Sequence, residues 1–338
     1  MVCVKFTTVS CQMPNRKNIA ILCSGGDVSG MNAALKRFVE YSIAKGLTPY
    51  FIHNGFEGLI DNKIYQAGYS DVAGIISRGG TKIRSSRSKR FMEQAYRKQA
   101  LNNLKSHNIV NLIILGGDGS FKGMQVLSDE SEGIGFSGIP STIDNDIAGT
   151  EYCLGVDTAL NVIKYAIDSI RDTASSFSRA FVIEAMGRES GYLALVSALT
   201  SGAEMCLVPE IPYELDNYKE RFKRQMKEGR EYFIAVLSEA LDNSEQVSKW
   251  FEEEIGIESR VMILGHIQRG GNPTVYDRLM AFDFVTYAVD GLLEGNQSSV
   301  VCYNKDGFNH KKIKEVAFKK YHMGDDLLRM GREFGSNK

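Results

Sequence analysis

The chain has 338 residues and a formal net charge of -1, so bulk charge argues neither for nor against a nucleic-acid partner. Its hydrophobic fraction of 43% is ordinary for a globular protein with a sizeable core, and its length predicts two domains or one large α/β unit. No apolar run reaches the roughly 18 residues of a membrane span, and we expect neither nucleic acid nor a membrane as a partner.

The first 17 residues lack the long apolar segment and the small-residue cleavage site of a secretory signal. We interpret them as an extension of unknown role. The six cysteines show no spacing typical of a zinc site. Their scatter along a chain of this length predicts free thiols in a reducing cytoplasm, where we expect the protein to reside.

Three segments, taken in chain order, share one plan: a short apolar strand, a glycine-rich turn and then a helix. They span residues 18–46, 110–129 and 180–210, and the last one ends in a further strand. Residues 232–240 and 261–271 contain two more predicted buried strands. Strands that alternate with helices are typical of parallel sheets covered on both faces.

The segment 159–172 predicts a helix with one buried face. Its apolar side chains recur at helical spacing, at Leu160, Ile163, Ile167 and Ile170. With only six prolines and no low-complexity linker, two domains, if present, are expected to be interwoven rather than strung apart.

Two glycine-rich loops follow predicted strands, and the carboxyl ends of such strands are where α/β sheets bind ligands. The first loop contains Gly25-Gly26-Asp27, and the second runs from Gly116 to Ser120. A glycine turn that opens a helix presents backbone N–H groups and the positive end of the helix dipole, which suits phosphate. Either loop alone is as well explained by a simple turn. Two of them, with acidic residues, favour a polyphosphate and a metal ion.

Two familiar nucleotide motifs are missing from the sequence. There is no G-x-x-x-x-G-K-[ST], so this is not a P-loop enzyme. The G-x-G-x-x-G pattern with an acidic residue ~20 positions on is also missing, which weakens a dinucleotide interpretation.

The stretch GIPSTIDNDIAG, residues 138–149, places Thr142, Asp144 and Asp146 directly after an apolar strand. Such a polar run can also be a turn or a helix cap. Cations that could balance phosphate charge stand near other turns: the run RSSRSKR at residues 84–90, Arg188, His266 and Arg269. Each of these alone is as well explained by a solvated surface, but together they favour one anion-binding edge.

Seven separated motifs, in this order, resemble those of the bacterial-type 6-phosphofructokinase family: SGGDVSGMNAA, RGGTKIRSSR, GGDGS, TIDND, EAMGRESG, SEA and GHIQRGGNP. The match runs from about Asn18 to Gly295. The resemblance implies an ATP- and Mg²⁺-dependent glycolytic kinase that phosphorylates fructose 6-phosphate at its 1-hydroxyl to give fructose 1,6-bisphosphate.

The resemblance also implies an α/β fold of two interwoven three-layer αβα domains with mainly parallel, Rossmann-like sheets. We expect the larger, ATP-binding domain to take residues 1–155 and about 268–318. The smaller, sugar-phosphate-binding domain would take residues 156–267 and about 319–338.

Roles for individual residues are likewise implied by the resemblance. Asp144 matches the general base for the sugar hydroxyl, and Thr142, Arg188 and Arg87 complete the catalytic group. Asp118 and Asp146 match the acids linked to Mg²⁺. The residues that match ATP-binding positions are Gly26, Arg87, Ser88, Gly117, Asp118, Gly119 and Ser120. Those that match sugar-phosphate positions are Thr142, Asp144, Arg179, Met186, Gly187, Arg188, Glu239, Arg260, His266 and Arg269.

Arg179 and Arg260 match residues that this family lends to a neighbouring subunit, so the resemblance implies a homotetramer with shared active sites. Read from the chain alone, Arg179 could equally be a surface residue.

The allosteric site of bacterial-type members binds ADP or phosphoenolpyruvate between subunits through a basic cluster. This chain keeps Lys36, Arg171, Arg230, Gly202 and Glu204 at matching positions. It has Glu40, Tyr69 and Glu228 in place of cations and Tyr232 in place of a histidine. We therefore expect weak or absent effector responses, unless Lys227 or Arg37 replaces the lost contacts.

Three alternatives remain. Pyrophosphate-dependent members of the fold carry an aspartate where Gly119 stands and a lysine where Ser141 stands, so the small residues here favour ATP. A non-catalytic regulatory subunit would be expected to lose Asp144 or the metal acids. A kinase for a longer sugar phosphate, such as sedoheptulose 7-phosphate, would carry similar motifs.

Overall fold

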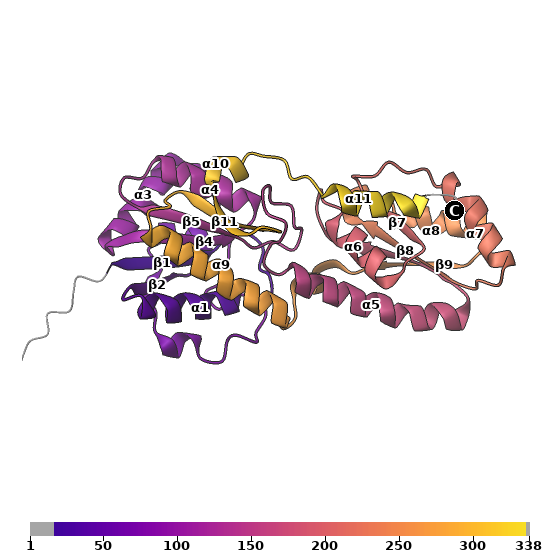
Figure 1. Cartoon of the computed structure of the whole chain (residues 1–338), viewed down its shortest axis with the longest axis horizontal. Helices are drawn as coiled ribbons and strands as arrows, with labels where there is room; N and C mark the ends of the chain where they lie inside the picture. The colour runs from indigo at the N-terminus through magenta and orange to yellow at the C-terminus, as the bar shows by residue number, and fades with distance from the viewer. Residues whose placement is uncertain (1–16, 336–338) are drawn as a thin grey trace, which may run out of the picture.

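The computed structural model describes residues 17–335, whose strands form two separate sheets in two lobes (Figure 1). The extension at residues 1–16, with Cys3 and Cys11, lies outside the described residues. Cys23, Cys153, Cys206 and Cys302 are free, as predicted, and all four are buried. Within residues 17–335, no helix combines the length and the apolarity needed to cross a bilayer.

The larger sheet is mainly parallel. Its seven strands run in the order β11 (Gly307–Lys312), β10 (Ser299–Asn304), β5 (Gly135–Pro140), β4 (Ile109–Gly116), β1 (Asn18–Cys23), β2 (Thr48–Ile52) and β3 (Ile64–Gln66). Only the outermost pairs, β10 with β11 and β2 with β3, are antiparallel. Successive side chains of β1, β4 and β5 are buried, as expected when helices cover both faces of a sheet.

Helices cover both faces of this sheet (Figure 1). One face carries α1 (Met31–Ala44) and α9 (Val275–Leu293), which pack on each other. The other carries α2 (Gly55–Ile60), α3 (Gln94–Ser106), α4 (Asp118–Asp129) and α10 (Ile313–Val316). The strand–turn–helix plans predicted for residues 18–46 and 110–129 are therefore confirmed as β1 with α1 and β4 with α4.

The smaller sheet is entirely parallel, in the order β7 (Met205–Leu207), β8 (Phe233–Ser238), β6 (Ala180–Ala185) and β9 (Ser259–Ile263). One face packs on α5 (Val156–Phe177) and α6 (Tyr192–Ser201), and α11 (Asp325–Arg332) lies against α6. The other packs on α7 (Asp216–Lys227) and α8 (Ser244–Trp250) through a second apolar core. In α5, Ile163 and Ile167 are fully buried and Leu160 and Ile170 pack against the core, as predicted.

The prediction that residues 261–271 contain a buried strand is wrong in one respect. The strand exists as β9, but it is the edge strand and pairs only with β6. Its last residue, Ile263, is 65% exposed. An apolar run identifies a strand, but it does not say whether a partner within the same chain covers the strand.

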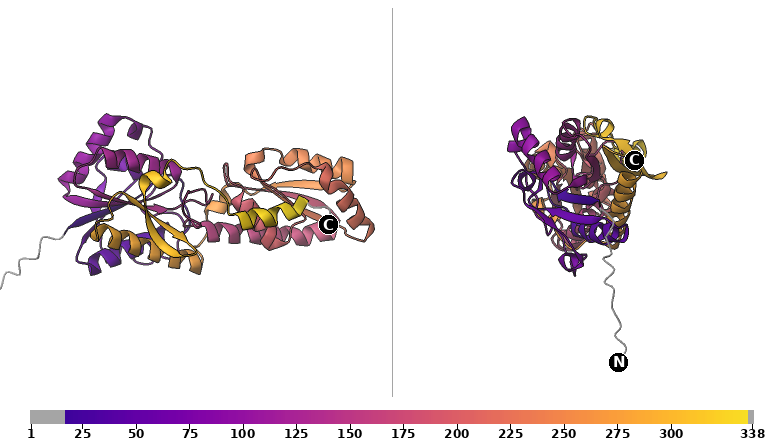
Figure 2. Two further views of the ribbon diagram at one scale, coloured as in Figure 1. Left: turned by 45° about the horizontal axis from the view of Figure 1, so that its top comes forward. Right: turned by 90° about the vertical axis from the view of Figure 1, so that its left-hand side faces the viewer.

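The chain passes between the lobes three times, which agrees with the predicted interweaving (Figures 1 and 2). It leaves the larger sheet after β5 and enters α5, returns after η5 (Gly265–Arg269) into α9, and crosses again between α10 and α11. The carboxyl ends of β1, β4 and β5 face the first crossing.

Candidate active site

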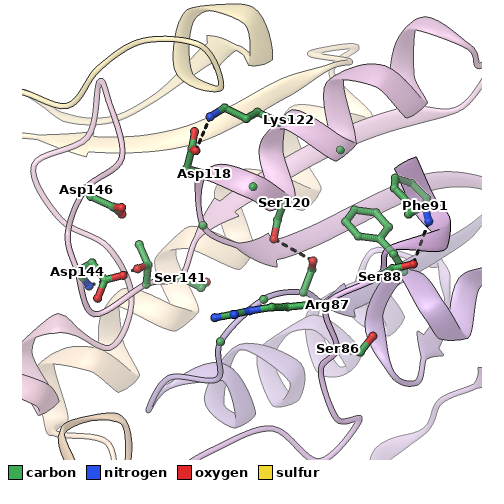
Figure 3. Close-up of a pocket in the computed structure, with 18 of the residues that line it drawn as sticks. Ser86, Arg87, Ser88, Phe91, Asp118, Ser120, Lys122, Ser141, Asp144 and Asp146 are labelled. Atoms are coloured by element: carbon green, nitrogen blue, oxygen red, sulfur yellow. Dashed lines mark hydrogen bonds and ion pairs between the residues drawn. The ribbon is translucent and has the colours of Figure 1, made fainter. Parts of the chain in front are cut away.

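A cavity of about 660 Å³ lies where the lobes meet, at the carboxyl ends of β1, β4 and β5. Figure 3 shows Asp144 and Asp146 at one end of it, Phe91 and Ser88 at the other, and Ser120 and Arg87 between them. Twelve residues predicted from the sequence line it: Gly26, Arg87, Ser88, Gly117, Asp118, Gly119, Ser120, Thr142, Asp144, Asp146, Arg188 and Arg269.

The middle of the cavity consists of the two glycine loops. Gly25 has φ +85°, which an L side chain rarely adopts. Gly117 is the N-cap of α4, so the amino end of that helix opens toward the cavity. The Oγ atom of Ser120 donates a hydrogen bond of 2.9 Å to Oγ of Ser24 and so ties the two loops together. Backbone N–H groups and a helix dipole in this arrangement suit a chain of phosphates.

Arg269 reaches across from η5 to the first loop. A Cβ atom added at Gly26 would lie 2.3 Å from Nη1 of Arg269, so a larger residue at this position would displace the guanidinium group from its present place. The structure thus puts this arginine against the first glycine loop of the larger lobe, although the sequence had suggested contact with the sugar phosphate. A cation in this position can neutralise negative charge shared by donor and acceptor.

The segment after β5 brings both carboxylates into the cavity. Asp144 is 1% exposed, and the Oδ1 atoms of Asp144 and Asp146 have no hydrogen-bond partner within residues 17–335. The N–H of Asp144 donates to Oγ1 of Thr142 at 3.3 Å. These oxygens therefore stay available for a ligand.

The pKa values of both carboxyl groups are raised. Burial is the main cause for Asp144, and the positive charges of Arg188 and Arg269 counteract it. Burial together with the neighbouring charge of Asp144 raises the pKa of Asp146 to about 6. Nε of Arg188 lies 3.4 Å from Oδ2 of Asp144. A buried carboxylate beside arginines can accept a proton from a hydroxyl group near neutral pH.

Arg188 stands on an unusual stretch of backbone after β6. Gly187 has φ +151° and Arg188 has φ +53°, a conformation that costs free energy for a residue with a side chain. Oε1 of Glu239 accepts the N–H groups of Gly187 at 3.1 Å and of Arg188 at 2.8 Å. Glu239 therefore holds this backbone in place, a role that the sequence did not indicate.

The far end of the cavity is apolar, and the sequence reasoning missed it. Phe91 lies at this end, and the cavity is also lined by the apolar side chains of Phe56, Met92, Val126 and Phe318. The rings of Phe56 and Phe91 stack with centroids 4.0 Å apart. No motif signals this surface, because Phe318 and Phe91 are far apart in the sequence and only the fold brings them to one cavity. A flat aromatic group such as a nucleobase fits an apolar end of this kind.

Two polar clusters fix the turn that carries Phe91 and Met92. Arg97 donates from Nη1 to their carbonyl oxygens at 3.0 and 2.6 Å and pairs through Nε and Nη2 with Glu130. The hydroxyl group of Ser88 donates to Glu57 and accepts the N–H of Phe91 at 3.1 Å. Ser88 lines the cavity as predicted, but its hydroxyl group is used to fix the turn.

Six predicted residues do not line this cavity: Met186, Gly187, Glu239, His266, Arg179 and Arg260. Met186 and Gly187 directly precede Arg188 in the sequence, and Glu239 accepts the N–H of Arg188. The N–H of Met186 donates to Oε1 of Gln268 at 3.1 Å. His266 is exposed on η5. Arg179 and Arg260 both pair with Glu258, around the start of β9, and neither lines the cavity that contains Asp144 and Asp146 of the same chain.

Asp118 forms an ion pair at the mouth of the cavity. Its Oδ2 atom lies 2.6 Å from Nζ of Lys122, one turn further along α4. Within residues 17–335, no group of three or more His, Cys, Asp or Glu side chains is arranged to hold a metal ion. A hard cation here would need ligands from a bound phosphate chain in addition to carboxylate oxygens.

The fold and cavity define a phosphotransferase of the α/β class, and comparison with known proteins identifies its family. The family model for phosphofructokinase matches residues 18–292. The chain is 73% identical over 320 residues to the ATP-dependent 6-phosphofructokinase of Sulfurovum sp., covering 95% of this chain and 98% of that protein. It is 63% identical to the protein of the same name from Sulfurimonas denitrificans, covering 94% and 100%.

Solved structures agree in fold. Phosphofructokinase from Saccharomyces cerevisiae superposes with a TM-score of 0.84 at 33% identity, over 89% of this chain and 45% of that longer chain. A pyrophosphate-dependent phosphofructokinase from Marinobacter aquaeolei gives a TM-score of 0.81 at 19% identity, over 95% and 92%; this likeness concerns the fold alone. The chain belongs to the phosphofructokinase family, and it is a kinase.

Proposed function

We propose that this protein transfers the γ-phosphoryl group of ATP to the 1-hydroxyl group of fructose 6-phosphate, in glycolysis. The observation that carries the proposal is the continuity of the cavity. It runs from the buried carboxylate of Asp144, past two glycine loops, to an apolar end where Phe91 stacks on Phe56. A nucleoside triphosphate has this sequence of parts, with a transferable phosphate, a phosphate chain and a base.

Two small residues support ATP over pyrophosphate as the donor. A Cβ atom at Gly119 would meet nothing within 4 Å, so the space beside the second loop is open to the α-phosphate. Ser141 is 2% exposed and donates to the carbonyl group of Ile139 at 3.1 Å. Neither position adds the charge that a donor without a nucleoside would need. The apolar end would also have no occupant if the donor were pyrophosphate.

The transfer can be written from the side chains at the site. The 1-oxygen of the sugar attacks the γ-phosphorus, the bond from the γ-phosphorus to the β,γ-bridging oxygen breaks, and Asp144 takes the hydroxyl proton. Arg188, Arg87 and Arg269 would neutralise charge on the transferring group and the leaving ADP. Thr142 would hold either the phosphoryl group or the sugar. Positioning and charge neutralisation supply most of the rate in phosphoryl transfer.

The buried, unpartnered Oδ1 atom of Asp146 fits a Mg²⁺ ion that arrives with the nucleotide. When bound, Mg²⁺ neutralises charge on the phosphate oxygens. Asp118 would join it directly or through water only by giving up its ion pair with Lys122.

On the sugar side, the second oxygen of Glu239 would accept hydrogen bonds from sugar hydroxyl groups, and His266 would donate to the 6-phosphate. Met186 and Gly187 would line the same pocket. The lobe of the larger sheet would act as the ATP-binding domain and the lobe of the smaller sheet as the sugar-phosphate-binding domain. A longer sugar such as sedoheptulose 7-phosphate is the second candidate acceptor.

Arg179 and Arg260 would serve the active site of a neighbouring subunit in a homotetramer in the cytoplasm. Support comes from the surface around them. Ile263 at the end of the edge strand β9 is 65% exposed, Ile267 on η5 is 57% exposed and Tyr165 on α5 is 75% exposed. An unpaired strand edge and exposed apolar side chains each favour burial against another subunit.

A substrate panel with product analysis tests the proposal. The protein is supplied with ATP, Mg²⁺ and either fructose 6-phosphate or sedoheptulose 7-phosphate, and phosphorus NMR locates the new phosphate ester. We expect one ADP formed per sugar and a phosphate at carbon 1 of fructose 6-phosphate. A higher kcat/KM for the seven-carbon sugar, or ATP hydrolysis without sugar phosphorylation, would contradict it.

A further inference from the structure

Asn145 stands between the two carboxylates of the site. It is completely buried and has φ +48°. Asparagine tolerates this left-handed conformation better than most residues. The directions of Asp144 and Asp146 both depend on this one residue, because it determines how the backbone turns between them.

The side chain of Asn145 cross-links the loop that carries the carboxylates. Its Nδ2 atom donates to the carbonyl oxygen of Glu151 at 3.1 Å, and its Oδ1 atom accepts the N–H of Cys153 at 2.9 Å. The loop then returns to its starting strand, where the N–H of Leu154 donates to the carbonyl oxygen of Pro140 at 2.9 Å. Asn145 therefore fastens the outgoing half of the loop to the returning half.

An amide side chain can make both bonds at once. One side must donate to a carbonyl oxygen and the other must accept from an N–H group, which an ionised aspartate or an aliphatic residue cannot do. Glycine would accept the backbone conformation but make neither bond. The residue type thus matches both demands of the position.

One oxygen of each neighbouring carboxylate has no hydrogen bond from the described part of the chain to hold it in place. Oδ1 of Asp144 and Oδ1 of Asp146 have no hydrogen-bond partner among residues 17–335. Arg188 contacts Asp144 through its other oxygen, Oδ2, at 3.4 Å, and the backbone that Asn145 holds sets the direction from which both carboxyl groups enter the cavity. We propose that Asn145 is a positioning residue, which orients Asp144 and Asp146 toward the transferring phosphoryl group through its two bonds to the returning half of the loop.

Thr150 offers a matched control, because it fastens the same loop at a distance from the carboxylates. It is buried, its Oγ1 atom donates to the carbonyl oxygen of Tyr303 at 3.1 Å, and it accepts the N–H of Tyr303 at 3.0 Å. Thr150→Val removes these bonds at nearly constant shape. It should lower Tm while leaving kcat within about threefold of wild type.

The test compares Asn145→Gly and Asn145→Asp with Thr150→Val and wild type. The inference rests on the proposed function, so kcat and both KM values are measured with ATP and fructose 6-phosphate, and Tm is measured beside them. We expect kcat to fall about 10²-fold in Asn145→Gly, as for a reacting group misplaced by about 1 Å, with the sugar KM changed less than about threefold. Asn145→Asp keeps the size of the side chain and one hydrogen-bond acceptor but loses the donor, and its kcat should fall at least tenfold.

A crystal structure of Asn145→Gly provides a readout that does not depend on the reaction. We expect the carboxyl groups of Asp144 and Asp146 to be displaced or to adopt several conformations. Unmoved carboxylates, or a kcat within threefold of that of Thr150→Val at a similar Tm, would overturn the inference. An inactive wild type would instead count against the proposed function, and the positions of the carboxylates would still decide the inference.

Discussion

Nε of Arg188 lies 3.4 Å from Oδ2 of Asp144, although the two residues come from different lobes. Asp144 follows β5 of the larger sheet, and Arg188 follows β6 of the smaller one. The charge of Arg188 also lowers the pKa of Asp144 against the effect of burial. The proposed proton acceptor and a cation proposed to bind the transferred group thus meet only when both lobes are in place.

Replacing the proposed base should separate catalysis from binding. Asp144→Ser should lower kcat by at least ~10²–10⁴-fold, while sugar binding changes only a few fold, because the carboxylate acts mainly in the transition state. Steady-state kinetics with calorimetric binding of fructose 6-phosphate would measure both. A nearly unchanged kcat would show that Asp144 is not the base.

Removing the charge of Asp146 should stabilise the fold in a pH-dependent way. Its folded-state pKa is raised to about 6, above the ordinary value of about 4, so the ionised form is disfavoured in the native state. The ionised carboxylate therefore lowers the folding stability of the wild-type protein. This loss of stability is missing below about pH 4, grows as the pH rises toward 6 and is complete above pH 6. Asp146→Asn should therefore be more stable at pH 8 by on the order of 2 kcal/mol.

Thermal denaturation with EDTA and without nucleotide, at pH 4.5, 6 and 8, would follow this gain in Tm. The gain should shrink steadily toward the lowest pH. A gain of equal size at all three values would mean that the charge of Asp146 is not its cause.

Two substitutions at Glu239 should differ in kcat. Glu239→Gln keeps an oxygen that can accept the N–H groups of Gly187 and Arg188, so kcat should stay within a few fold while the sugar KM rises. Glu239→Ala releases the strained backbone around Arg188, and kcat should fall at least ~10-fold, since one transition-state contact is loosened. Equal kcat values for the two variants would show that the hydrogen bonds from Gly187 and Arg188 to Glu239 do not position Arg188 for catalysis.

Sharing of sites between subunits can be tested by mixing variants. Arg260→Ala should raise the sugar KM far more than the KM for ATP, and Arg188→Ala should be nearly inactive. Denaturing and refolding the two together should restore activity at sites that combine intact residues from both chains. If hybrids form, as judged by mass spectrometry, and no activity returns, Arg260 acts within its own chain.

The response to ADP should be weak, because the retained cations of the expected effector site have partners within the chain. Lys36 pairs with Glu40, Arg230 pairs with Glu204 at 2.5 Å, and Arg171 donates to the carbonyl oxygen of Ser201. Losing three cationic contacts of ~1 kcal/mol each would cost ~10²-fold in affinity.

Saturation curves for fructose 6-phosphate with and without millimolar ADP would measure this response. The two curves should nearly coincide, apart from competition at the ATP site. A clear leftward shift that Arg171→Ala abolishes would show that the effector site works.

Local chemistry predicted much of the site. Gly26 and Gly117 follow buried strands, and parallel strands bring their carboxyl ends to one edge, so the phosphate loops and Asp144 could be expected to lie together. The alternation of strands and helices likewise predicted both sheets. These inferences depend on periodicity and turns, which short stretches of sequence encode.

Other features depend on contacts between distant segments. Phe318 lines the same cavity as Phe91, but no local pattern links a residue after α10 to a turn before α3. The acceptor role of Glu239 depends on the backbone at Gly187, which adopts its unusual φ only in the folded loop. The exposure of Ile263 followed from the place of β9 at the sheet edge, which strand propensity does not encode.

The choice of phosphoryl donor tests the central claim most directly. Initial rates of fructose 1,6-bisphosphate formation would be compared at saturating fructose 6-phosphate and Mg²⁺, with ATP or pyrophosphate as the donor at equal concentrations. Because the apolar end with Phe91 and the open space at Gly119 suit a nucleotide, the rate with ATP should exceed that with pyrophosphate at least ~10-fold, equivalent to about 1.4 kcal/mol. A faster reaction with pyrophosphate would contradict the account.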